Sequence, residues 1–418
     1  MKNGLNALAL FGGRAVRNKP LSGPYPGALM IGKEEEKAVL RVLREKNLYR
    51  FYGPGKSAPS QVSSFEKAFA GKIGTHYALG VSSGTAALSC ALRGMGIGLG
   101  DEVIVPAFTY VGTPGAVVSS YAVPVFAEVD ESLGLDPADV ERRITKRTKA
   151  IISVHMLGAP CKMAELMRVA RRHKLLVLED CAQSCGAFYR GRRAGSIGDM
   201  GIFSFQLNKI ITAGEGGAVV TNNYDFFERA VRCHDHGAFR VAKDTGGTPL
   251  IGEGYRMCEI SGAIAGVQLR RLERIIANLR RAKNYIQTNI SDLKGITFRK
   301  EADPKGEAAA AVVFFVSRRE QALEVIRALN AENIRAVQMY NGLPPYRQPQ
   351  FLKQSTVSRT GYPFKYPGAG KVVYEAGMCP KSEDLLGRMV CITLNASLSK
   401  RDLNDIVEGV RKVAAVYI

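Results

Sequence analysis

The stretch that decides the fold runs from residue 175 to residue 221, LLVLEDCAQSCGAFYRGRRAGSIGDMGIFSFQLNKIITAGEGGAVVT. It holds three short apolar runs, at Leu175–Glu179, Gly201–Phe205 and Gly217–Thr221. Runs of this length, rich in Val, Leu, Ile and Phe and bounded by turn residues, predict buried β-strands. Since ligands of such sheets bind beyond the carboxyl ends of the strands, the residues just after each run are the ones to inspect for function.

The same pattern extends upstream to Tyr77, because short apolar runs there alternate with amphipathic stretches. Further strands are expected at Tyr77–Val81, Glu102–Pro106, Pro124–Val129 and Ala150–His155. Helical periodicity predicts helices at Thr85–Arg93, Thr113–Ser120, Pro137–Ile144 and Lys162–His173. Strands that alternate with helices predict an α/β fold with a mainly parallel, seven-stranded sheet that helices cover on both faces.

Downstream of Thr221 the pattern changes to that of an α+β unit. It predicts a long helix from Met257 to about Ile290, strands at Ala308–Val316 and Ile334–Gln338, and helices at Glu320–Leu329 and Arg401–Ala415. A chain of 418 residues is long enough for two domains. We therefore expect an N-terminal arm (residues 1–20), a large domain (21–256) and a smaller C-terminal domain (257–418) that begins with the long linking helix.

The net charge of +20, from 58 Lys and Arg against 38 Asp and Glu, admits three explanations. It could serve a nucleic acid, an anionic substrate or only a solvated surface. The densest basic excess, at residues 266–300, follows helical periodicity, and basic and aromatic residues are not interleaved as on an RNA-binding sheet. Nucleic-acid binding therefore stays as an alternative suggested by charge alone, and no nucleic-acid partner is expected.

Composition also indicates where in the cell the protein works and whether it binds a metal. The longest uninterrupted apolar run, Ala308 to Val316, has nine residues, whereas a membrane-spanning helix needs roughly 20, so no membrane association is expected. The eight cysteines are scattered and form no C-x-x-C pair, which favours reduced thiols over a metal site. These features predict a cytoplasmic protein without a metal.

Four segments that follow predicted strands carry chemistry. In Val81-Ser82-Ser83-Gly84-Thr85, a strand ends in small residues that open a helix, and the free N–H groups of a helix N-terminus bind anions such as phosphate. Ser-Gly-Thr is also an ordinary helix cap, so this segment alone does not identify a ligand. The segment Pro106–Tyr110 places aromatic rings after another strand, where a ring can stack on a planar cofactor or pack in the core.

The other two segments supply an acid and an amine. Glu179 and Asp180 end an apolar strand, and a carboxylate there can hold a protonated ring nitrogen, although a lone acidic pair would more often be a turn or a cap. Ser204 ends the next strand, and Lys209 follows in a stretch from Met200 to Gly214 without another charge. Apolar surroundings lower the pKa of an amine, as a Schiff-base lysine requires. Together the four segments supply what pyridoxal phosphate (PLP) needs.

The sequence also resembles the DegT/StrS family of fold-type I PLP-dependent aminotransferases, which act on nucleotide-linked keto-sugars and on keto-cyclitols. The resemblance runs over nearly the whole chain, and its densest motifs are S-S-G-T-A-A-L from residue 82, G-D-E-V-I-V-P-A-F-T-Y from residue 100, E-D-C-A-Q-S from residue 179 and S-F-Q-x-x-K-x-x-T-A-G-E-G-G-A-V-V-T from residue 204. The S-F-Q form is similar to the branch that aminates inosose-type cyclitols with glutamine as donor.

The resemblance implies a role for each matching residue. Lys209 would form the Schiff base and carry the proton, and Asp180 would pair with the pyridinium nitrogen. The other cofactor contacts would come from Gln183 at the phenolic oxygen, Tyr110 on the ring, and Gly84, Thr85 and Ser204 at the phosphate. These roles imply an aminotransferase that moves an amino group from glutamate or glutamine to a keto-sugar or keto-cyclitol, in amino sugar or aminocyclitol biosynthesis.

The sequence departs from the family at one position. Most relatives are homodimers with shared active sites, in which an Asn of a G-x-N-[YF]-R segment reaches the partner's cofactor phosphate, but here that Asn is replaced by Gly254. Arg256 or water would then substitute, or the cofactor is held less tightly. His155, Tyr340 and Arg256 are candidates for substrate contact. A PLP-binding regulator without turnover is the alternative function that the Gly254 departure leaves open.

Overall fold

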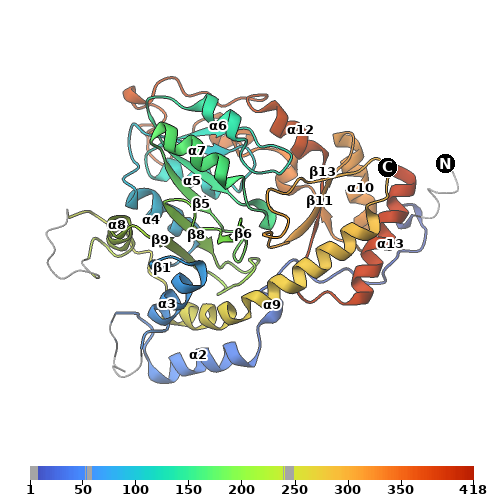
Figure 1. The fold of residues 1–418 in the computed structure, drawn as a ribbon, viewed down its shortest axis with the longest axis horizontal. Helices are drawn as coiled ribbons and strands as arrows, with labels where there is room; N and C mark the ends of the chain where they lie inside the picture. Colours follow the sequence, from blue (N-terminus) through green and yellow to red (C-terminus); the bar gives the residue numbers. More distant parts are fainter. Residues whose placement is uncertain (1–7, 52, 54–58, 239, 241–248) are drawn as a thin grey trace.

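The structure is a computed structural model that describes residues 8–51, 53, 59–238, 240 and 249–418. Two β-sheets with their helices lie side by side along the long axis of the molecule, and one long helix passes beneath both (Figure 1). Within the described ranges, no helix is long and apolar enough to cross a membrane.

The first sheet has seven strands in the order β1-β9-β8-β5-β4-β2-β3. Its strands are β1 (Tyr77–Val81), β2 (Glu102–Pro106), β3 (Val123–Ala127), β4 (Thr148–Val154), β5 (Leu176–Asp180), β8 (Met200–Ser204) and β9 (Gly217–Thr221). All neighbours are parallel except β9, which is antiparallel to both β1 and β8. The predicted α/β class and the mainly parallel seven-stranded sheet are confirmed, with strand bounds shifted by at most two residues.

Helices cover both faces of this sheet, because successive side chains of its strands alternate between two apolar cores. Ile151 and Val177 join the core beneath α6 (Pro137–Arg143) and α7 (Met163–His173), whereas Ile152 and Leu178 join the core shared with α4 (Gly84–Gly94). The remaining helices around this sheet are α2 (Lys33–Glu45), α3 (Gln61–Ile73), α5 (Gly112–Ser119) and α8 (Tyr224–His234), of which α8 was not predicted.

The long helix α9 (Glu259–Ile290) confirms the linking helix predicted from periodicity. Its 32 residues span about 48 Å, and it packs against α3 below the first sheet and against α13 (Lys400–Tyr417) beside the second. Because α9 contacts both halves of the molecule, the division into domains 21–256 and 257–418 stays a prediction.

The second sheet is antiparallel, with the strand order β10-β11-β13-β12. Its strands are β10 (Thr297–Phe298), β11 (Ala311–Phe315), β12 (Ala336–Val337) and β13 (Met389–Thr393), and α10 (Arg319–Ala331) and α12 (Pro380–Arg388) pack beside it. The expected strands were too long at both β11 and β12, and β13 and α12 were not predicted. A small hairpin (β6, Phe188–Tyr189; β7, Arg192–Arg193) and short helical turns complete the described chain: η1 (Ala9–Phe11), η2 (Ala28–Met30), η3 (Met156–Gly158), η4 (Met339–Gly342), η5 (Pro345–Arg347), α11 (Pro349–Leu352) and η6 (Pro367–Ala369).

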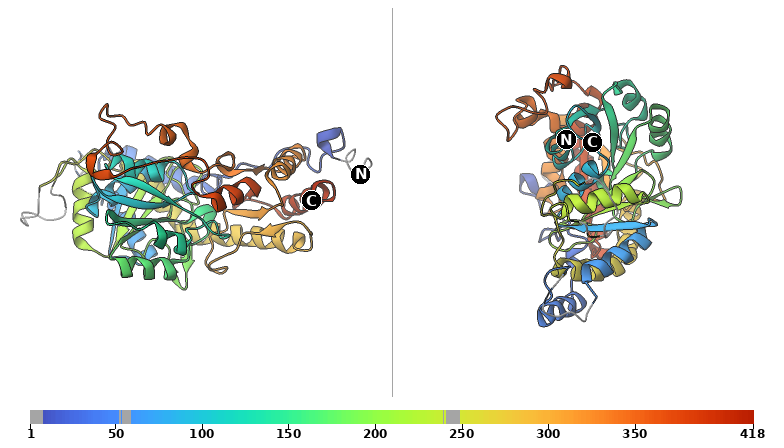
Figure 2. Two further views of the ribbon diagram at one scale, coloured as in Figure 1. Left: turned by 90° about the horizontal axis from the view of Figure 1, so that it is seen from above. Right: turned by 90° about the vertical axis from the view of Figure 1, so that its left-hand side faces the viewer.

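Two further segments pack against the sheets and their helices. The chain between β12 and α12 returns over the first sheet (Figure 2), where the Tyr374 hydroxyl donates to the Pro124 carbonyl at 2.7 Å. At the other end, the Glu332 carboxylate accepts the Ala9 and Val16 N–H groups, each at 2.8 Å. Residues 1–7 of the expected N-terminal arm lie outside the described residues; the rest of it packs against α10 and α13.

Candidate active site

A cavity of about 710 Å³ opens at the carboxyl ends of β5 and β8, between the two sheets. Every cofactor residue predicted from the sequence lines it, namely Gly84, Thr85, Tyr110, Asp180, Gln183, Ser204 and Lys209. The second sheet and its loops contribute Arg335, Gln338, Met339, Tyr340 and Thr393, and the N-terminal segment contributes Pro24 and Pro26. The structure therefore brings the predicted cofactor residues together, beside a second wall that the sequence identified only at Tyr340.

The N-terminus of α4 lines the cavity and forms a cradle that could hold an anion. Ser83 caps the helix through its Oγ, which accepts the Ala86 N–H at 3.0 Å. A Cβ added at Gly84 would lie 2.7 Å from the Ser204 Cβ, so glycine is needed for this close approach. Free N–H groups and the helix dipole favour a phosphate here, with the Thr85 and Ser204 hydroxyls beside it.

Asp180 provides a buried carboxylate on the cavity wall. Its Oδ2 accepts a hydrogen bond from the Thr113 hydroxyl at 2.9 Å, and its Oδ1 accepts the Ala182 N–H at 3.0 Å. Burial raises the pKa of Asp180, while these hydrogen bonds and the nearby Lys209 charge act in the opposite direction. A buried carboxylate that faces a cavity is suited to a cationic partner such as a protonated ring nitrogen.

Lys209 lies on the loop after β8, partly buried in the same cavity. The loop is held from both sides, because the Lys209 N–H donates to the Gln206 carbonyl at 3.0 Å and its own carbonyl accepts the Gly27 N–H at 3.3 Å. Burial lowers the pKa of Lys209, and the Asp180 and Glu215 charges only partly oppose this. The result favours the neutral amine, which is the nucleophilic form.

Tyr110 and Gln183, from loops of the first sheet, lie close to Tyr340 of the second wall. Tyr110 is 58% exposed, and its ring centroid lies 6.2 Å from that of Tyr340. The Gln183 side-chain amide donates to the Tyr340 hydroxyl at 3.2 Å, and burial raises the pKa of that hydroxyl. Tyr340 and its neighbour Asn341 both adopt positive φ angles, 53° and 57°, which non-glycine residues rarely hold outside functional or tightly constrained sites.

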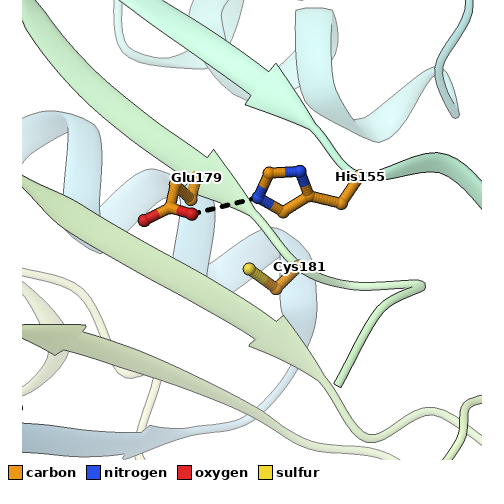
Figure 3. A group of neighbouring side chains, drawn as sticks. All are labelled: His155, Glu179 and Cys181. Carbon is orange, nitrogen blue, oxygen red and sulfur yellow. Dashed lines mark hydrogen bonds and ion pairs between the residues drawn. The ribbon is translucent and has the colours of Figure 1, made fainter. Parts of the chain in front are cut away.

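His155 directly follows β4 and, contrary to expectation, is not among the residues that line the cavity. Its Nε2 donates to the Glu179 carboxylate at 3.1 Å (Figure 3), and its Nδ1 accepts the Cys161 N–H at 3.0 Å. The side chain is fully buried, so a direct substrate contact is not supported by its position. Donor atoms of His155, Glu179 and Cys181 lie within 4.8 Å of one another, but both ring nitrogens and both Glu179 oxygens already have hydrogen-bond partners.

Arg256 also lies outside the cavity. It forms an ion pair with Asp235, and the segment that contains it pairs with the end of β1, where the Ser82 N–H donates to the Tyr255 carbonyl at 2.8 Å. A Cβ at Gly254 would meet the His236 ring at 3.3 Å. Neither Gly254 nor Arg256 is among the described residues that line the cavity with Gly84 and Thr85.

Sequence reasoning missed the other lining residues for two different reasons. Thr113 carries a visible signal, because it lies at the start of a helix that follows the predicted strand Glu102–Pro106. In the structure its hydroxyl also forms a hydrogen bond with that of Thr109 at 2.9 Å. Arg335 and Thr393 carry no local signal, since they meet only through the pairing of two strands that lie far apart in the chain.

Comparison with known proteins places these residues in context. Residues 30–411 match the model of the DegT/DnrJ/EryC1/StrS aminotransferase family. The chain belongs to this family. It is 37% identical over 296 residues (68% of this chain, 78% of the relative) to a GDP-perosamine synthase of Caulobacter vibrioides. It is 39% identical over 277 residues (64% of each chain) to an L-glutamine:2-deoxy-scyllo-inosose aminotransferase of Streptomyces lividus.

Solved structures agree with this assignment. The crystal structure of S. venezuelae DesV superposes with a TM-score of 0.78 at 30% sequence identity, covering 91% of this chain and 94% of DesV. The family and these structural neighbours are PLP-dependent aminotransferases. The DegT/DnrJ/EryC1/StrS chain described here is therefore an enzyme of the aminotransferase class, which disfavours the regulator without turnover.

Proposed function

We propose that this enzyme binds PLP and transfers an amino group from glutamate or glutamine to a keto-sugar, carried on a nucleotide, or to a keto-cyclitol. The observation that carries the proposal is that Lys209 and Asp180 face one cavity directly beside the N-terminus of α4. An amine of lowered pKa, a buried carboxylate and an anion cradle are the three groups that PLP requires of a protein, and the residues present fit it.

Bound PLP supplies an electron sink, which makes loss of the proton from the donor's Cα accessible. The chain supplies the rest. The α4 N–H groups with Thr85 and Ser204 hold the phosphate, Asp180 keeps a proton on the ring nitrogen, and the exposed Tyr110 ring covers one face. Thr113 and the Ala182 N–H fix the Asp180 carboxylate in place for this task.

The Lys209 amine would take the proton from the donor's Cα and deliver it to C4′ of the cofactor, and in the second half-reaction it would move a proton from C4′ to the acceptor carbon. A group that acts as both base and acid works best when its pKa is near the working pH. Burial moves the pKa of Lys209 in that direction. Because the deaminated donor leaves before the acceptor enters, while its amino group stays on the enzyme, we expect ping-pong kinetics.

The acceptor class is supported by the relatives, which include a GDP-linked sugar synthase and glutamine-dependent inosose aminotransferases. Two features of this chain favour different acceptors. The net charge of +20 attracts an anionic nucleotide-linked sugar, whereas the Ser204-Phe205-Gln206 motif is similar to the cyclitol branch. Both acceptors belong in the same experiment.

The test uses the purified holoenzyme and its visible absorbance. Glutamate or glutamine should bleach the absorbance of the lysine-bound cofactor, and the true acceptor should restore it. Nucleotide-linked keto-sugars and scyllo-inosose-type keto-cyclitols form the two arms of the screen. Absorbance that no amino donor bleaches, or that persists unchanged in Lys209→Ala, would contradict the proposal.

We further propose that two copies form a homodimer with shared active sites. Tyr110 and Leu207, at the cavity and beside Lys209, are exposed by 58% and 45%, which a second chain would cover. Light scattering should give twice the mass of one chain; a monomer that retains full activity would exclude shared sites.

A further inference from the structure

Arg335 is the one cation besides Lys209 that lines the cavity, counting only the described residues. Its side chain is exposed, and no carboxylate of the described chain pairs with it. It lies just before β12, on the wall that the second sheet contributes, whereas Lys209 lies on the wall of the first sheet. An unpaired guanidinium at a cavity is available to bind an anionic group.

Strand pairing places a hydroxyl beside Arg335. Since Ala336 pairs with Ile392 and Val337 with Cys391, the antiparallel register brings Arg335 opposite Thr393. Ala336 and Ile392 point into the core on the far face of the sheet, so Arg335 and Thr393 both turn toward the cavity. Thr393 lines it, and its Oγ1 is buried without a hydrogen-bond partner among the described residues. Buried hydroxyls are rarely left unsatisfied unless a ligand or water completes them.

We propose that Arg335 and Thr393 form the subsite for the α-carboxylate of the amino-acid donor, an inference that rests on the proposed function. Every turnover brings such a carboxylate into the cavity, because it is attached to the carbon from which Lys209 takes the proton. The planar guanidinium matches the two carboxylate oxygens, and the Thr393 hydroxyl adds a third donor. Phosphate shares this anionic chemistry, so the experiment separates the two ligands.

The direct test measures binding without turnover. Glutarate, which has the carboxylates of glutamate but no amine, is titrated into the PLP-loaded enzyme by calorimetry, and guanosine diphosphate serves as the phosphate probe. Arg335→Gln should weaken glutarate binding by about tenfold or more and leave guanosine diphosphate unchanged. Arg327→Gln, which removes an exposed arginine of α10 outside the cavity, is the matched control and should change neither.

Three results would overturn the proposal: glutarate affinity unchanged in Arg335→Gln, guanosine diphosphate affinity lost instead, or no glutarate binding by the wild type. Arg335→Lys keeps the positive charge but loses the planar, bidentate guanidinium, so its glutarate affinity should lie between those of the wild type and Arg335→Gln. Thr393→Val, close in shape, should raise the glutarate Kd a few-fold. The two conservative variants keep the test valid if Arg335→Gln folds poorly.

Half-reaction kinetics tie the subsite to turnover. In Arg335→Gln the KM for glutamate or glutamine should rise about tenfold or more, while reaction of the preloaded pyridoxamine form with the keto acceptor stays unchanged. A defect confined to the acceptor half-reaction would contradict a donor subsite. If the wild type forms no visible cofactor absorbance at all, the proposed function fails and the donor subsite fails with it; normal absorbance with glutarate binding that does not depend on Arg335 overturns the subsite alone.

Discussion

The two walls of the cavity differ in how one fixed charge on each, Asp180 on the first and Arg335 on the second, is partnered. On the wall of the first sheet, Asp180 accepts two hydrogen bonds and Ser83 caps α4. On the wall of the second sheet, Arg335 has no carboxylate partner in the described chain and the Thr393 hydroxyl has no hydrogen bond at all. We therefore expect the first wall to hold the cofactor and the second wall to contact the exchanging substrates.

Architecture explains this difference. The first wall is built on the ends of β5 and β8, central strands of a sheet that is buried on both faces. The second wall is built on β12, an edge strand of two residues, and on the turn Met339–Gly342 that follows it. Rigid elements hold catalytic geometry, and short edge elements tolerate variation in substrate. We therefore expect variants of the first wall to affect catalysis and variants of the second to affect KM.

The largest effect is expected at Lys209, on the first wall. Lys209→Ala removes both the amine that holds the cofactor and the group that moves the proton, so turnover should fall at least about 10⁴-fold. Steady-state transamination measures this, with Lys146→Ala, an exposed lysine, as control. Retention of near-normal turnover in Lys209→Ala would remove the basis for the first wall as the catalytic one.

The next effect separates two adjacent carboxylates of β5. Asp180 faces the cavity, whereas Glu179 faces the opposite side and accepts from His155. Asp180→Asn should lower kcat by roughly a hundredfold or more, because the ring nitrogen loses its buried counter-charge, with little change in melting temperature. Glu179→Gln should leave kcat nearly unchanged and lower the melting temperature. Its amide N–H would face the His155 N–H, which costs about 1–3 kcal/mol of stability. Equal kinetic defects in both variants would contradict the assignment.

The pH dependence of cofactor loading sharpens the description of the first wall. Only the neutral Lys209 amine attacks the PLP aldehyde, so the loading rate of the apoenzyme should rise about tenfold per pH unit below the amine's pKa and then level off. Burial lowers the pKa of Lys209 from its ordinary 10.5, so the plateau should begin below that pH. Asp180→Asn removes a charge that raises this pKa and should move the plateau to still lower pH.

Stopped-flow absorbance measures the loading rates, and Nα-acetyl-lysine with PLP gives the unshifted reference. A plateau at the same pH as this reference would show that the surroundings of Lys209 do not favour the neutral amine. Glu179→Gln provides the matched control, because Glu179 is not among the charges that act on Lys209.

The sequence predicted the first wall almost completely and the second hardly at all. Strand ends of a parallel sheet are encoded locally, by an apolar run followed by polar residues, so Asp180, Ser204 and Lys209 were found without knowing any long-range contact. The position of Arg335 beside Thr393 depends on β12 pairing with β13, and the sequence gives no sign of which strands pair. The missed strand β13 is a run of five residues, Met389–Thr393, that resembles many short buried segments.

His155 shows a second limit of reasoning from strand ends. Its place after β4 predicted a side chain near the site, but its ring turns away from the cavity to reach Glu179. The alternation of neighbouring residues would have given this outcome only if the orientation of Asp180 had been known first. Helix α8 differs, since Asn223 caps it and its pattern is amphipathic, so the signal was present and was overlooked.

The smallest effect is expected at Tyr340, where the two walls touch. Its hydroxyl accepts the hydrogen bond of Gln183 at 3.2 Å, and its backbone holds a positive φ. Tyr340→Phe removes one neutral hydrogen bond, worth about 1 kcal/mol, and should raise the acceptor KM a few-fold with kcat nearly unchanged. Tyr110→Phe, on the first wall, is the control. The Tyr110 hydroxyl makes no hydrogen bond with the described residues, and the substitution keeps the contact between its ring and that of Tyr340. A kcat defect in Tyr340→Phe as large as that of Asp180→Asn would show that the second wall also positions the reacting groups, and the contrast between the walls would not hold.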